Sequence, residues 1–175
     1  MNPAQDHKIQ GVVLDWAGTI VDFGSLAPMG AFVELFARHH MEITIAEARV
    51  PMGLPKIEHI AALGRMPAIA AQWQALHGRS FGQEDAQQLL NEFEPMSAKA
   101  ALDRSSFIPG FLSAYHALTA QGLAFATTTG YTRKIMTPLI EIARAQGFAP
   151  ALVVCCDDVA RSRPDPMGMQ ACLQA

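Results

Sequence analysis

The sequence predicts a doubly wound parallel α/β fold into which an all-helical segment is inserted. Three observations support this prediction. Apolar runs at residues 9–14, 123–129 and 151–156 alternate with helical patterns in the outer parts of the chain, as is typical of parallel sheets. The block from residue 24 to residue 104 shows only helical patterns. The chain has 175 residues, which suits one domain or a core with a modest insertion.

The first strand and the inserted helices follow from local signals. The apolar run at 9–14 ends in an acid, so a short buried strand is expected there. Pro28 favours a helix start, and Thr44 with Glu47 forms a capping-box pattern before a second short helix. A loop is expected at 51–55, then helices over 56–63, 68–77 and 83–102, with Pro95 as a candidate break in the last.

Strands and helices alternate again after Pro109. A helix is expected up to Gly122, followed by a strand over 123–129, a helix ending at Gly147, a strand over 151–156 and a last helix from about Pro166. Only three strands are expected, fewer than in a usual sheet, and the sequence stops within a helical pattern. We therefore expect a C-terminally truncated α/β core, residues 1–23 and 105–175, and a helical cap, residues 24–104.

Composition and charge exclude several classes. The net charge is −3 and no Lys/Arg run occurs, so neither nucleic acid nor a membrane surface is an expected partner. No segment approaches the ~18 apolar residues of a membrane span, and the N-terminus does not resemble a signal peptide. Cys155, Cys156 and Cys172 lack disulfide or zinc spacing. A cytoplasmic location is expected.

Polar side chains follow each predicted strand, where ligands bind in open α/β sheets. Taken singly, each residue has a more common explanation. An Asp after a strand is more often a turn residue, a Thr at a strand end is more often an ordinary strand former, and an Arg in a loop more often lies on the solvated surface. Their occurrence after all three strands, with glycines at 18 and 130, favours a site for a tetrahedral oxyanion. The candidates are Asp15, Thr127, Thr128, Thr129, Asp157, Asp158, Arg161 and Arg163.

These motifs resemble a known superfamily. "DWAGT" at 15–19, "TTTGYT" at 127–132 and "RPDP" at 163–166 are similar to those of the haloacid dehalogenase superfamily of aspartate-nucleophile hydrolases. Within it, "LDWAGTIVDFGSLAP" with "EARVPMGLPKIEHI" resembles the phosphonoacetaldehyde hydrolase (phosphonatase) family. The resemblance implies a Rossmannoid core with a helical cap. It also implies hydrolysis of phosphonoacetaldehyde to acetaldehyde and phosphate, a step in 2-aminoethylphosphonate degradation.

Ala17 and Lys56 distinguish this family from phosphate-ester hydrolases. Ester-cleaving members usually place a second Asp two residues after the nucleophile to protonate an alkoxide, and here that residue is Ala17. Cleavage of a carbon–phosphorus bond instead needs an electron sink, which an imine on Lys56 would supply. A helix start and an apolar flank favour its neutral amine, and His59 at i+3 could relay a proton. The commoner fate of lysine is a snorkelling surface position.

The resemblance implies a role for each site residue. Asp15 would be the nucleophile and, with the carbonyl of Ala17, a Mg²⁺ ligand. Arg163 would neutralise charge on the phosphoryl group. The family completes its Mg²⁺ site with carboxylates of a fourth loop, which nothing after Asp165 supplies. The remaining predicted substrate-binding residues are Met52, His59, Thr129, Gly130 and Tyr131.

Assembly and two rival functions stay open. The family implies a homodimer through the cap, and Phe32, Val33 and Phe36 form an apolar stripe that could serve it or could be internal core. One rival is another capped phosphatase or phosphomutase of the superfamily acting on a phosphate ester. The other is a non-catalytic truncated module that keeps the fold.

Overall fold

Three parallel strands form the sheet of the computed structural model, which describes residues 9–174. The strands are β1 (Gly11–Leu14), β2 (Ala124–Thr128) and β3 (Leu152–Val154), in the order β1-β2-β3. Leu14 lies opposite Thr127, and Thr128 lies opposite Val154. The three carboxyl ends therefore meet at one edge, and the loops that follow them can build one site.

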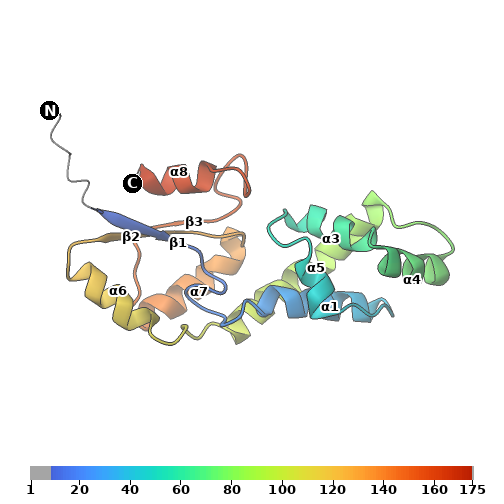
Figure 1. Ribbon diagram of the computed structural model, residues 1–175, viewed down its shortest axis with the longest axis horizontal. Helices are drawn as coiled ribbons and strands as arrows, with labels where there is room; N and C mark the ends of the chain where they lie inside the picture. The colour runs from blue at the N-terminus through green and yellow to red at the C-terminus, as the bar shows by residue number, and fades with distance from the viewer. Residues whose placement is uncertain (1–8, 175) are drawn as a thin grey trace, which may run out of the picture.

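Helices cover both faces of this sheet, as expected for a doubly wound fold (Figure 1). Helices α6 (Phe111–Thr119) and α7 (Arg133–Ala145) lie on one face, and α8 (Met167–Leu173) lies on the other. The fit of α8 is tight, because a Cβ added to Gly168 would lie 2.9 Å from the hydroxyl of Thr128. The predicted α/β fold class is confirmed.

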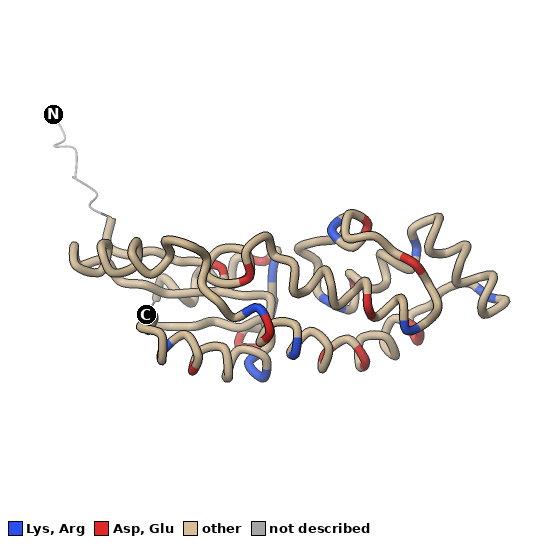
Figure 2. Tube along the Cα trace, turned by 90° about the horizontal axis from the view of Figure 1, so that it is seen from below, with Lys and Arg blue, Asp and Glu red and all other residues tan. Residues whose placement is uncertain are grey.

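Five helices form a separate helical block between β1 and α6. They are α1 (Ala27–Arg38), α2 (Ile45–Arg49), α3 (Lys56–Gly64), α4 (Pro67–His77) and α5 (Gln83–Asp103). The block lies beside the α/β part along the long axis of the molecule (Figure 1), and acidic and basic positions are interspersed along it (Figure 2). None of the described helices has the length and apolar character that crossing a membrane requires.

Each part has its own apolar cluster. In the helical block, large side chains of α1, α3, α4 and α5 pack together, among them Phe32, Phe36, Ile60, Trp73 and Phe93. In the α/β part, the cluster includes Trp16, Ile20, Met136, Leu139 and Phe148. Burial of this much apolar surface in two places explains how each part keeps its shape.

The structure decides two points about the helical block that the sequence left open. Helix α5 continues through Pro95 without a break, because its buried face is held against α1 and α3 by Leu89, Phe93 and Met96. Phe32 and Phe36 are fully buried within the block, so the stripe that they form is internal core and not a free dimer surface.

The segment joining β1 to the helical block is tightly bent. Asp22 and Ser25 have φ values of 59° and 50°, a region that side chains other than glycine seldom adopt. The buried carboxylate of Asp22 accepts hydrogen bonds from the backbone N–H groups of Leu26 (3.1 Å) and Ala27 (2.8 Å). These bonds satisfy N–H groups at the start of α1 that have no partner within the helix and so fix the direction in which the block begins.

Candidate active site

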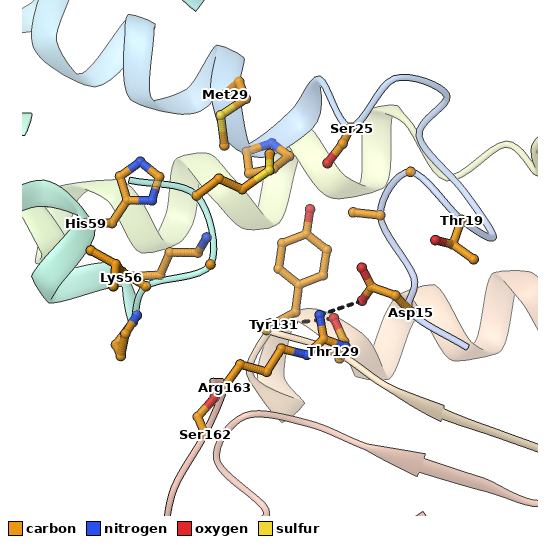
Figure 3. Close-up of a pocket in the computed structure, with 18 residues that line it drawn as sticks. Asp15, Thr19, Ser25, Met29, Lys56, His59, Thr129, Tyr131, Ser162 and Arg163 are labelled. Carbon is orange, nitrogen blue, oxygen red and sulfur yellow. Dashed lines mark hydrogen bonds and ion pairs between the residues drawn. The ribbon is translucent and has the colours of Figure 1, made fainter. Parts of the chain in front are cut away.

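A cavity of about 350 Å³, here called the main cavity, lies between the carboxyl edge of the sheet and the helical block (Figure 3). Its walls come from the loops after β1 and β2, the start of α1, the turn before α3 and the loop before α8. The structure brings all nine residues of the family-based prediction to this cavity: Asp15, Ala17, Met52, Lys56, His59, Thr129, Gly130, Tyr131 and Arg163.

Asp15 and Arg163 form the charged floor of the main cavity. Oδ1 of Asp15 lies 3.0 Å from Nη1 of Arg163. The other terminal nitrogen of Arg163 donates to the carbonyl of Thr128 at 2.8 Å, which fixes the guanidinium at the end of β2. A carboxylate held beside a fixed guanidinium suits the binding of a phosphoryl group, since arginine offsets the negative charge of its oxygens.

Of the three threonines at the end of β2, only Thr129 reaches the main cavity. The hydroxyl of Thr127 accepts a hydrogen bond from the indole nitrogen of Trp16 at 2.8 Å, which gives this buried tryptophan a structural role. Thr128 is buried beneath α8. Thr129 lies past the strand end, where its hydroxyl accepts from the backbone N–H of Tyr131 at 3.2 Å.

The acidic pair after β3 does not line the main cavity, contrary to expectation. Asp157 accepts from the backbone N–H of Arg133 at 2.8 Å, and Asp158 forms an ion pair with the side chain of Arg133. Both carboxylates therefore join the end of β3 to the start of α7. Arg161 is likewise turned away and pairs with Asp165 at 2.6 Å.

Lys56 is the first residue of α3 and approaches the main cavity from the helical block (Figure 3). Its amine lies 5.6 Å from the centroid of the Phe32 ring. Burial lowers the pKa of Lys56, while Cys156 and Asp15 act in the opposite direction. The net lowering increases the fraction of neutral amine at pH 7, the form that attacks a carbonyl group.

His59 lies one helical turn after Lys56, and its ring is almost fully buried. Nε2 lies 2.9 Å from the carbonyl oxygen of Ala48. A carbonyl can only accept, so Nε2 carries the hydrogen and Nδ1 has a free lone pair, which has no hydrogen-bond partner among the described residues. Burial, and secondarily the charge of Lys56, lowers the pKa of His59 to about 4, so the ring is neutral at pH 7.

Tyr131 is also buried, and its hydroxyl points into the main cavity (Figure 3). This hydroxyl has no hydrogen-bond partner within residues 9–174. Burial raises the pKa of Tyr131 well above its ordinary value, and the charges of Asp22 and Asp15 add to the effect. The phenol therefore stays protonated at neutral pH.

Several lining residues were not singled out from the sequence. Met29 lies toward Lys56 and His59 in the main cavity, and Ser25 lies on the side of Asp15 and Thr19 (Figure 3). Ser162 also lines this cavity. Ser25 and Thr19 stand within the quoted motif around Asp15, but nothing in their residue type separates a cavity position from a turn position.

The chain is similar to known hydrolases over most of its length. A model described as haloacid dehalogenase-like hydrolase matches residues 9–175. The phosphonoacetaldehyde hydrolase of Paraburkholderia phytofirmans is 46% identical over 158 residues, which cover 90% of this chain and 59% of that protein. That of Salmonella typhimurium is 45% identical over 162 residues, covering 91% and 60%. The chain thus spans about three-fifths of the length of these curated relatives.

Solved structures agree with these matches. A phosphonoacetaldehyde hydrolase-like protein from Oleispira antarctica superimposes with a TM-score of 0.90 at 40% identity, covering 95% of this chain and 60% of that one. A putative phosphoglycolate phosphatase from Lactobacillus plantarum gives a TM-score of 0.70 at 16% identity, covering 95% and 71%, which shows the shared fold alone. The resemblance seen in the sequence motifs is confirmed, and the chain belongs to the haloacid dehalogenase-like hydrolase family.

Proposed function

We propose that the protein hydrolyses the carbon–phosphorus bond of phosphonoacetaldehyde and releases acetaldehyde and phosphate. The observation that carries this proposal is that Lys56 of the helical block and Asp15 of the α/β part line one cavity. The names of the relatives at 45–46% identity support it. Such a reaction would belong to phosphonate degradation, and a cytoplasmic location fits it.

The first step is imine formation at Lys56. The neutral amine attacks the aldehyde carbon, the carbonyl oxygen leaves as water, and a protonated imine remains. Burial around Lys56 favours the neutral amine that begins this step. His59, one helical turn after Lys56, is in this proposal the residue that relays a proton during carbinolamine formation.

Phosphoryl transfer to Asp15 follows. The carboxylate attacks phosphorus, the carbon–phosphorus bond breaks, and its electron pair moves through carbon to the imine nitrogen, which gives an enamine. Arg163, Thr129 and Gly130 bind the phosphoryl oxygens in this proposal. Water then hydrolyses the aspartyl-phosphate and the imine that re-forms from the enamine. Ala17 fits this route, since no alkoxide needs protonation.

The donor set of the main cavity partly fits Mg²⁺. Asp15 offers a carboxylate oxygen, and the carbonyl of Ala17 accepts no hydrogen bond from the described residues. Both are the hard oxygen ligands that Mg²⁺ prefers, but the ion takes six. These two residues would hold the ion, which when bound neutralises negative charge on the phosphoryl oxygens.

The architecture supports a division into a core, residues 1–23 and 105–175, and a cap, residues 24–104. Closure of the cap would bring Met52 and Tyr131 around the substrate and exclude water from the imine. A homodimer through the cap remains part of the proposal. It must use surfaces other than the buried side chains of Phe32 and Phe36.

Reductive trapping tests this proposal. The protein is treated with phosphonoacetaldehyde and borohydride, and the adduct is located by peptide mass mapping. The proposal predicts a stable adduct on Lys56 and none at that position in the Lys56→Gln variant. Turnover of phosphonoacetaldehyde without any adduct on Lys56 would refute the imine route. Rapid hydrolysis of phosphate esters with inert phosphonoacetaldehyde would instead favour an ester-cleaving hydrolase.

A further inference from the structure

A second cavity of about 250 Å³, here called the side cavity, adjoins the main cavity. Both cavities are lined by Lys56 and Tyr131. The other walls of the side cavity come from α3, α5, the start of α7 and the loop after β3. Lys56, whose amine the proposed reaction uses, therefore borders both cavities, and phosphonoacetaldehyde needs only the one that holds Asp15 and Arg163.

The lining of the side cavity is unsuited to a phosphonate. Ile57, Leu90, Phe93 and Ile135 make its walls apolar. Lys56 is the sole cationic residue in its lining as described, and the carboxylates of Glu94 and Asp157 stand at its exposed margin. Two carboxylates and an apolar wall repel a dianion and favour an uncharged apolar group.

One polar group inside the side cavity lacks a partner. Ser97 is 1% exposed, it belongs to the lining of the side cavity, and its hydroxyl makes no hydrogen bond to any described residue. A buried hydroxyl without a partner is unfavourable. This hydroxyl has almost no accessible surface, so it offers no hydrogen bond to a ligand, and the wall that a ligand meets around it is apolar.

We propose that the side cavity binds the alkyl chain of neutral aliphatic aldehydes whose carbonyl carbon condenses with Lys56. The proposal rests on the proposed function in that it uses the same amine. The nitrogen of Lys56 bonds to the carbonyl carbon, the oxygen accepts protons and leaves as water, and a protonated imine forms. Neutral aldehydes are thus a second class of ligand, which competes with the phosphonate substrate for Lys56.

Chain-length dependence of trapping tests this assignment. The protein is incubated with subsaturating acetaldehyde, butanal or hexanal and cyanoborohydride, which transfers hydride to the imine carbon. Labelling of Lys56 is measured relative to Lys99, whose side chain is 77% exposed. Because a buried methylene strengthens binding about fourfold, the ratio should rise about two- to fourfold for each added methylene.

Two variants fill the side cavity from different walls. Leu90→Phe adds bulk from α5, and Cys156→Phe adds it from the loop after β3. Each should lower hexanal labelling of Lys56 at least tenfold and leave acetaldehyde labelling within twofold of wild type. The matched control is Asn91→Phe, which adds bulk at the exposed neighbour of Leu90 outside the cavity and should behave as wild type.

The outcomes separate this inference from the proposed function. A labelling ratio that does not depend on chain length would overturn it, as would an equal loss of acetaldehyde and hexanal labelling in both folded variants. A parallel labelling experiment with phosphonoacetaldehyde tests whether the main cavity supports imine formation at Lys56. Failure of phosphonoacetaldehyde to label Lys56, with the chain-length dependence intact, would refute the proposed function and leave the side cavity assigned.

Discussion

The ring of Phe32 stacks on the imidazole of His59, with ring centroids 4.1 Å apart. The amine of Lys56 lies 5.6 Å from the centroid of the same phenyl ring, and Phe93 stacks on it at 4.2 Å. One buried aromatic ring of α1 therefore positions two side chains of α3. It also opposes the effect of burial on Lys56, because a ring face stabilises an ammonium ion.

Replacement of Phe32 by leucine should affect both stability and the amine. We expect Phe32→Leu to lower the free energy of unfolding by about 1–3 kcal/mol through lost packing. It should also move the pH profile of reductive trapping at Lys56 to lower pH, since the ammonium loses its aromatic contact. Phe36→Leu is the control, because Phe36 is equally buried one turn further along α1. A similar pH shift in both variants would contradict the prediction.

The buried neutral state of His59 should make stability depend on pH. Its pKa of about 4 in the folded protein is below the ~6.5 of an unfolded chain. The stability it contributes is therefore complete above about pH 6.5 and declines as the pH falls towards about 4. Between pH 7 and pH 5 wild type should lose about 2 kcal/mol more than His59→Gln, by urea denaturation. Parallel pH profiles of the two proteins would contradict this.

The contact between Trp16 and Thr127 should be a structural requirement. Thr127→Val keeps the shape but removes the acceptor for the buried indole N–H, so the free energy of unfolding should fall by about 1–3 kcal/mol. Thr127→Ser keeps the hydroxyl, so the free energy of unfolding should fall by less than in Thr127→Val. Equal losses in the two variants, measured by chemical denaturation, would show that the hydrogen bond is unimportant.

Replacement of each of the two arginines in the loop before α8 should have sharply different effects on activity. Arg163→Met removes the guanidinium 3.0 Å from Asp15, and kcat/KM for phosphonoacetaldehyde should fall about 10²–10³-fold. Arg161→Met is the matched control, because Arg161 pairs with Asp165 and its side chain is 72% exposed. It should retain activity within about twofold. Equal losses in the two variants would contradict the assignment.

Much of the fold and of the candidate site could be predicted from the sequence. The outer strands and helices were predicted from apolar runs and from glycine and proline positions. The capping box at Thr44 is present, with the Glu47 backbone N–H donating to the hydroxyl at 3.1 Å. The residues around Asp15 and Lys56 could be singled out because the motifs that contain them resemble those of a known family.

The features that the sequence did not predict correctly depend on three-dimensional packing. Asp157, Asp158 and Arg161 stand at the predicted edge of the sheet, but the order of residues does not reveal which side chains turn back to α7 or to Asp165. Pro95 breaks helices by its own preference, yet the packing of α5 against α1 and α3 outweighs that preference. The side cavity could not be foreseen, because its walls join four segments far apart in the chain.

In the proposed reaction, Lys56 and Asp15 act in sequence on the same bound molecule. Borohydride trapping of phosphonoacetaldehyde in wild type and Asp15→Asn, with the Lys56 adducts resolved by mass, tests it most directly. Wild type should yield the ethyl adduct left after carbon–phosphorus cleavage, and Asp15→Asn should accumulate only the phosphonoethyl adduct. An ethyl adduct formed equally well in Asp15→Asn, or phosphate release by wild type with Lys56 unlabelled, would contradict the account.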